Sequence, residues 1–90
     1  MILTSTINPY GGVVVTPAEL PKDPAVFQAS LSLSLSEWSK QGYKLVWLEL
    51  PIQEAQLIPL ATTAGFTFHH ATAAYLMLTY RLIPEAPSLA

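Results

Sequence analysis

The stretch from residue 65 to residue 80 constrains the fold more than any other part of this chain. It opens on Gly65, passes through Phe66 and Phe68 to the adjacent His69 and His70, and ends in a run of apolar and aromatic residues. The pattern predicts a hairpin of two strands, residues 66–69 and 74–82. Successive side chains of a strand point to opposite faces, so the apolar residues of the second strand need cover on both sides.

Two earlier segments also predict strands. Residues 13–16 are a β-branched run, and residues 44–50 are apolar at nearly every position, as in a central strand covered on both faces. Proline follows both segments and helps to end them.

A helix is expected between these two strands, over residues 24–41. Asp23 before Pro24 is a typical helix start, and Gly42 is a typical stop. Serine and leucine alternate within it at strand period, but about eighteen residues between start and stop are too many for one strand. We expect its serines to face solvent, and its buried face to contain the residues that recur at helical spacing: Phe27, Leu31, Leu35 and Trp38.

Residues 52–64 predict a second helix that ends at Gly65. Pro59 interrupts it, because proline removes one backbone hydrogen bond and crowds the preceding turn, at a cost of about 3 kcal/mol in a straight helix. We therefore expect a kink near Leu57 or two short helical pieces.

The expected fold class is α/β, in the order β-α-β-α-β-β, with a mixed sheet flanked by two helices. The crossover should make the first two strands parallel neighbours or near-neighbours. Residues 1–9 are expected to be an N-terminal extension in a turn or extended conformation, residues 10–82 the domain, and residues 83–90 a proline-bearing linker or tail.

Composition excludes several function classes. The 90 residues are 51% hydrophobic and 11% charged, with a net charge of −2, so a surface covered by a second copy or a further domain is expected. Four scattered basic residues make no nucleic-acid surface, and the apolar runs are too short to span a membrane. The absence of cysteine is compatible with a cytoplasmic location.

No catalytic or metal-binding pattern stands out. On a regular strand His69 and His70 would point to opposite faces, and no cysteine or nearby carboxylate completes a ligand set. Glu49 and Glu54 suit ordinary structural positions, and no glycine-rich phosphate loop opens a helix. Trp38 and Trp47 are interpreted as core residues because no basic cluster accompanies them. We expect no catalytic, cofactor-binding or metal site in this chain.

Several sequence blocks resemble a known domain. These are Tyr10-Gly11-Gly12-Val13, Ser34-Leu35-Ser36-Glu37-Trp38, Val46-Trp47-Leu48-Glu49-Leu50-Pro51-Ile52, and above all Gly65-Phe66-Thr67-Phe68-His69-His70-Ala71 followed by Tyr75-Leu76-Met77-Leu78. Together they are similar to the pre-Nudix domain, which precedes the catalytic domain in the branch of Nudix hydrolases that includes the fibroblast growth factor antisense-type and plant proteins. The motif residues, expected to be structural, are Gly12, Trp38, Trp47, Pro51, Gly65, Phe66, Phe68, His69, His70 and Tyr75.

The resemblance implies a fold like half of a GNAT-type acetyltransferase and a Nudix domain after residue 90 of the parent protein. The divalent cation, Mg²⁺ or Mn²⁺, is expected only in that domain, since the Nudix box has no counterpart here. The acyl-CoA pyrophosphate loop of acetyltransferases is missing as well. The resemblance thus implies a non-catalytic module for interaction, dimerisation or substrate selection, with a minimal acyl-CoA-binding protein or a free-standing small dimer as alternatives. The expected partners are a Nudix domain in cis and a second copy of the chain.

Overall fold

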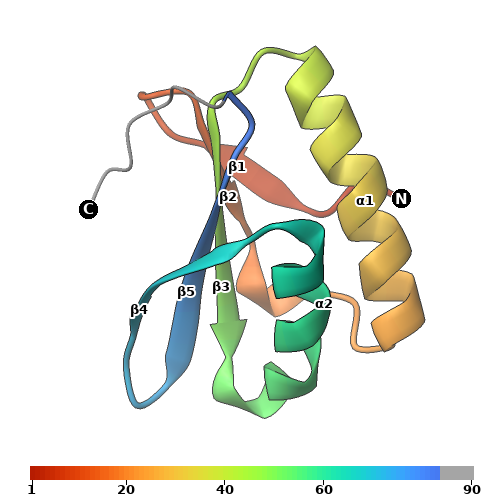
Figure 1. Cartoon of the computed structure of the whole chain (residues 1–90), viewed down its shortest axis with the longest axis vertical. Helices are drawn as coiled ribbons and strands as arrows, with labels where there is room; N and C mark the ends of the chain where they lie inside the picture. The colour runs from red at the N-terminus through yellow and green to blue at the C-terminus, as the bar shows by residue number, and fades with distance from the viewer. Residues whose placement is uncertain (84–90) are drawn as a thin grey trace.

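The computed structural model describes residues 1–83, which form one mixed sheet with two α-helices (Figure 1). The strands lie in the order β1-β2-β3-β5-β4. Their bounds are β1 Ser5–Ile7, β2 Gly12–Val15, β3 Leu45–Pro51, β4 Thr67–Ala71 and β5 Tyr75–Arg81. The helices are α1 Pro24–Lys40 and α2 Ile58–Ala64, with short 3₁₀ turns η1 Pro17–Glu19 and η2 Ile52–Leu57. The α/β class and the mixed sheet are confirmed.

The pairing of the strands follows the predicted connections. β2 and β3 are parallel neighbours across the α1 crossover, and β4 and β5 form the antiparallel hairpin. β5 also pairs with β3, so β3 is the central strand, with β2 on one side and β5 on the other. The likeness to an acetyltransferase half stays an expectation of the resemblance.

Helix α1 begins and ends as predicted. The Asp23 carboxylate accepts a hydrogen bond from the Ala25 N–H at 2.9 Å, and Gly42 takes a positive φ of 84° just past the end. Phe27, Leu31 and Trp38 are buried on its inner face, and Leu35 is half-buried beside them.

The expectation that the serines of α1 face solvent is wrong for two of them. Ser30 is 3% exposed and Ser34 is fully buried. The Ser34 hydroxyl donates to the Ser30 carbonyl at 2.6 Å and accepts from the Leu3 N–H at 2.8 Å. A serine paired in this way carries no unsatisfied polar atom into the core, and it lets the chain near Leu3 approach the helix closely.

Residues 1–9, expected to form an extension ahead of the domain, contribute to the sheet and to the core. Ser5–Ile7 pair antiparallel with β2, and Leu3 is 3% exposed within the hydrophobic core. Three mostly polar residues give no recognisable strand pattern, so β1 could not be predicted.

Both helices pack on the same face of the sheet (Figure 1). Along β3 the side chains of Val46, Leu48 and Leu50 are buried against them. On the other face Leu45 is 4% exposed at the start of the strand, whereas Trp47 and Glu49 are half-buried. The expectation that β3 is covered on both faces therefore fails beyond Leu45, because both helices lie over one face and, among the described residues, neither lies over the other.

The segment after β3 is bent, as Pro59 led us to expect. It splits into η2 and α2, with a non-helical backbone at Glu54 (φ −108°, ψ 28°). Pro59 lies in the first turn of α2, where its missing N–H has no intrahelical partner to lose. Within residues 1–83, neither helix has the length and hydropathy needed to cross a membrane. The predicted linker, residues 83–90, lies outside the described residues apart from Ile83.

Candidate functional site

The face of the sheet that the helices leave uncovered is the most distinctive surface of the molecule. The register places Val14, Trp47, Thr79 and Thr67 in one row across four strands, and Glu49, Met77 and His70 in the next. We call this surface the open face; it consists of Val14, Trp47, Glu49, Pro51, Thr67, His69, His70, Tyr75, Met77 and Thr79. Trp47, Met77 and Tyr75 are each half-buried, so large apolar side chains remain partly in contact with solvent.

A β-bulge shapes one end of the open face. Phe68 pairs with Leu78 and His70 pairs with Met77, which is the next residue back along β5. His69 is therefore the residue inserted by the bulge. Alternation from Thr67 already places His69 on the open face, and the inserted residue shifts His70 to the same side, opposite Met77. The expectation that the two histidines point to opposite faces is wrong for this reason.

The bulge assembles four rings into what we call the aromatic row. The Trp47 and His69 ring centroids are 4.9 Å apart, those of His69 and His70 are 4.9 Å apart, and those of His70 and Tyr75 are 5.9 Å apart. All three contacts are edge-on, the arrangement that ring quadrupoles favour. Because Trp47 lies on β3 and His69 on β4, the row crosses β5 at Thr79, which is only 7% exposed although no helix covers it.

The two imidazoles also touch through their nitrogen atoms. His69 Nδ1 and His70 Nδ1 are 2.6 Å apart, a contact in which one nitrogen donates its hydrogen and the other accepts it. His70 is exposed and His69 half-buried, so solutes can reach the pair.

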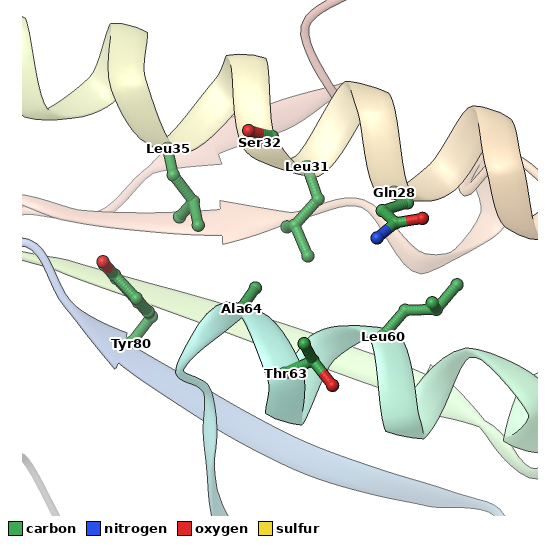
Figure 2. Close-up of a pocket in the computed structure, with 8 residues that line it drawn as sticks. All are labelled: Gln28, Leu31, Ser32, Leu35, Leu60, Thr63, Ala64 and Tyr80. Carbon is green, nitrogen blue, oxygen red and sulfur yellow. The ribbon is translucent and has the colours of Figure 1, made fainter.

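A groove of about 420 Å³ runs between the two helices (Figure 2). Leu31 and Leu35 of α1 and Leu60 of α2 project into it, and the Tyr80 ring of β5 lies at one end. Its remaining lining residues are Gln28, Ser32, Thr63 and Ala64, so no lining side chain carries a charge.

The remaining motif residues lie apart from the open face, except Pro51, which stands opposite Tyr75 at the end of β3. Trp38 is a core residue as expected, whereas Trp47 is not, because it belongs to the open face. Phe66 is buried and packs on Tyr80 with ring centroids 5.3 Å apart. Phe68, two residues on, is 63% exposed on the edge strand.

Two of the motif glycines occupy positions that a side chain would disturb. Gly65 ends α2 with φ 112°, and a Cβ there would meet the Tyr80 ring at 2.9 Å. A Cβ on Gly12 would meet the Asn8 amide at 2.6 Å. Asn8, which sequence reasoning missed, accepts hydrogen bonds from the Tyr10 and Gly12 N–H groups at 2.9 and 2.8 Å and so shapes the β1–β2 turn. The Asn-Pro turn pattern was the signal for this role.

The acidic residues do not converge on the histidines to form a recognisable catalytic set. Glu54 lies in η2 and accepts a hydrogen bond from the Gln56 amide at 2.9 Å, whereas Glu49 lies on the open face. Among residues 1–83 no three or more histidine, aspartate or glutamate side chains gather as a metal centre would require. The open face thus presents half-buried apolar and aromatic side chains together with Glu49, the two histidines and two threonines.

The structure is thus a small α/β domain with one sheet face that neither helix covers. Comparison with known proteins identifies its family: the model of the Nudix hydrolase domain matches residues 3–82, and the chain belongs to the Nudix hydrolase family.

Its relatives are considerably longer proteins. The chain is 43% identical to Nudix hydrolase 8 and 44% identical to Nudix hydrolase 2, both of Arabidopsis thaliana, over 88 residues in each case. It is 36% identical over 90 residues to the human protein named nucleoside diphosphate-linked moiety X motif 6. These matches cover 98%, 98% and 96% of this chain but only 24%, 31% and 28% of the relatives. The chain thus corresponds to a small part of each relative.

Proposed function

We propose that this chain is a non-catalytic N-terminal module of a Nudix hydrolase and that the open face is its interaction surface. A hydrolase domain in cis would cleave nucleoside-diphosphate-linked substrates and bind the divalent cation, Mg²⁺ or Mn²⁺. The module would hold that domain, or a second copy of itself, and so influence assembly or substrate selection. The cysteine-free composition fits a cytoplasmic protein, which is part of the same proposal.

The observation that carries the proposal is the uncovered central part of the sheet. β3 is the central strand and β5 lies beside it, yet Trp47 and Met77 on these strands remain half-buried on the open face. Complete burial of a fully exposed large apolar side chain contributes about 1.5–3 kcal/mol, and covering the exposed remainder of a half-buried one contributes a part of that. Tryptophan and tyrosine are among the residues that most often dominate binding energies at interfaces. The relatives also contain further chain that could cover an equivalent face, because about 70% or more of their length lies outside the match.

The coding sequence beyond residue 90 tests the first half of the proposal. A Nudix box, with its glycine and its glutamate-rich helix, is expected there. A native stop codon directly after residue 90 would exclude a hydrolase domain in cis.

Two matched variants test the second half of the proposal, that the open face is the interaction surface. Met77→Glu places a charge in the centre of the open face, whereas Leu33→Glu places the same charge on the outer side of α1, where Leu33 is already 50% exposed. In sedimentation of the isolated chain we expect self-association that Met77→Glu abolishes and Leu33→Glu preserves. In the parent protein we expect Met77→Glu to separate the unfolding of the module from that of the hydrolase domain. Equal behaviour of the two variants in both proteins would refute a role for the open face.

Acyl-CoA binding has less support. The interhelical groove is the cavity that could accept an acyl chain, but its uncharged lining offers no partner for the phosphates of coenzyme A. Calorimetric titration with acetyl-CoA should give no heat of binding at millimolar ligand.

A further inference from the structure

A hollow of about 450 Å³ lies at one edge of the sheet, where the chain enters β4 from the end of α2. Its lining residues are Gly65, Thr67, Thr79, Tyr80 and Arg81. We propose that this hollow binds one phosphate group of a small molecule, with Arg81 and Thr79 as its main partners. The site goes beyond the proposed function, because it needs neither a hydrolase domain nor a second copy of the chain.

The backbone of β5 contributes a donor to the hollow. The pairing of β4 with β5 begins at Thr67 and Thr79, so Arg81, two residues further along β5, has no partner on β4. The Leu82 N–H donates to the Lys44 carbonyl at 2.9 Å, on the side of β3. Successive backbone groups of a strand point to alternate sides, and the Arg81 N–H therefore points away from β3 and toward the hollow.

The hydroxyl of Thr79 is held at the hollow without a partner. Thr79 is only 7% exposed, and its hydroxyl makes no hydrogen bond within residues 1–83. The same residues contain no completely buried side-chain oxygen or nitrogen that lacks a partner, so this hydroxyl keeps contact with solvent. Nearly all polar groups buried to this extent are paired. A hydroxyl fixed by its buried surroundings can donate to a ligand oxygen at little cost in conformational entropy.

The charge of the hollow favours an anion. Arg81 is exposed, and none of the other lining residues carries a charge. A guanidinium group can donate two parallel N–H bonds to the oxygens of one phosphate. Because the four basic residues of the chain are scattered, the hollow offers charge for one phosphate and not for a nucleic-acid backbone.

The number of donors favours phosphate over carboxylate. The Arg81 guanidinium, the Arg81 N–H and the hydroxyls of Thr67 and Thr79 are four separate donor groups around one hollow. A phosphate monoester presents three terminal oxygens to such a set, whereas a carboxylate presents two. Small-molecule pockets have volumes of about 300–1,000 Å³, so the hollow also has room for part of the group that carries the phosphate.

The test is a titration of the ¹⁵N-labelled 90-residue chain with sodium phosphate near pH 7.5, followed by the amide signals in NMR spectra. Sodium chloride is adjusted to keep the ionic strength constant, and sodium acetate is titrated in parallel. We expect saturable shifts of the Arg81, Thr67 and Gly65 amides that give one dissociation constant. Acetate should bind at least about threefold more weakly, since it leaves donors of the hollow unpaired.

Two variants and one control assign the binding to the hollow. Arg81→Gln should lose about tenfold or more in phosphate affinity, because it removes hydrogen bonds between charged groups. Thr79→Val keeps the shape of the side chain and should lose about threefold or more. Lys22→Gln is the matched control: it removes the same charge from an exposed residue in the loop before α1 and should bind as the wild type does.

Shifts that grow linearly with phosphate, equal affinities for phosphate and acetate, or equal affinities in Arg81→Gln and Lys22→Gln would each overturn the proposal. The amide spectrum of each variant establishes that it is folded, and Arg81→Gln decides the matter if Thr79→Val unfolds, since Arg81 is exposed. The titration uses the isolated chain, so its result is independent of the proposed function.

Discussion

Replacing Ser34 by alanine should destabilise the domain far more than a serine substitution on a helix ordinarily does. The Ser34 hydroxyl is fully buried and joins α1 to the N-terminal segment, because it accepts from the Leu3 N–H at 2.8 Å. Removing the hydroxyl leaves that N–H buried without its partner, which costs about 1–3 kcal/mol. Alanine has a higher helix propensity than serine, which offsets at most about 0.7 kcal/mol of this loss in the free energy of unfolding. The expected net loss is about 1–2 kcal/mol.

This loss is readily measured in a domain of this size. A 90-residue chain loses about 4–8 °C in melting temperature for each kcal/mol, so Ser34→Ala should melt about 5–15 °C lower than wild type. Thermal and urea unfolding followed by circular dichroism give both the midpoint and the free energy of unfolding. All samples should be compared at one low protein concentration, because self-association would raise the apparent stability.

Ser32→Ala is the matched control on the same helix. Ser32 is exposed, so its substitution should change the free energy of unfolding by less than about 0.5 kcal/mol. If Ser34→Ala and Ser32→Ala melt at the same temperature, the hydrogen bond to Leu3 does not hold the N-terminal segment on α1, and the packing described for residues 1–9 is refuted.

Further predictions concern the backbone and are checked by the same unfolding measurements. Gly65→Ala should destabilise more than Gly42→Ala, because both glycines have positive φ but only at Gly65 would the new Cβ also meet the Tyr80 ring at 2.9 Å; the left-handed conformation alone costs about 1–2 kcal/mol, and equal losses would contradict the close contact. Pro59→Ala should change stability by less than about 1 kcal/mol, since this proline lies in the first turn of α2 rather than in a helix interior. A loss near 3 kcal/mol on that substitution would show that the bend after β3 depends on the proline ring.

The elements of the fold that could be predicted carry local signals. Helix α1 has an aspartate cap, a proline in its first turn and a glycine stop, and the structure uses all three. The hairpin and the parallel pair of strands follow from chain order and from the rule for crossover connections. The division of residues 52–64 into two short helical pieces agrees with the restriction that proline places on a helix.

The features that could not be predicted depend on tertiary contacts, and such contacts produce no periodic pattern in the sequence. The sequence does not distinguish the buried Ser34 from the exposed serines of α1, because its hydrogen-bond partner, the Leu3 N–H, comes from a distant segment. Strand β1 is three residues long and is defined by its pairing with β2 rather than by its composition. That both helices lie over one face of the sheet is likewise a property of the whole chain.

The arrangement of the open face could not be predicted from the sequence either. The motif residues Trp47, His69, His70 and Tyr75 were identified, but their meeting in one row was not. Strand alternation predicts opposite faces for adjacent histidines, and one bulged residue reverses that prediction. A bulge has no fixed composition, so only the register of β4 against β5 reveals it.

Thiol labelling tests most directly whether the open face is the interaction surface, because the chain has no cysteine of its own. The Met77→Cys and Leu33→Cys variants would be labelled both in the dilute isolated chain and in the parent protein, with the modified peptides quantified by mass spectrometry. The account predicts that Met77→Cys reacts much more slowly in the parent protein than in the isolated chain, while Leu33→Cys reacts at the same rate in both. Equal rates for Met77→Cys in the two proteins would contradict it.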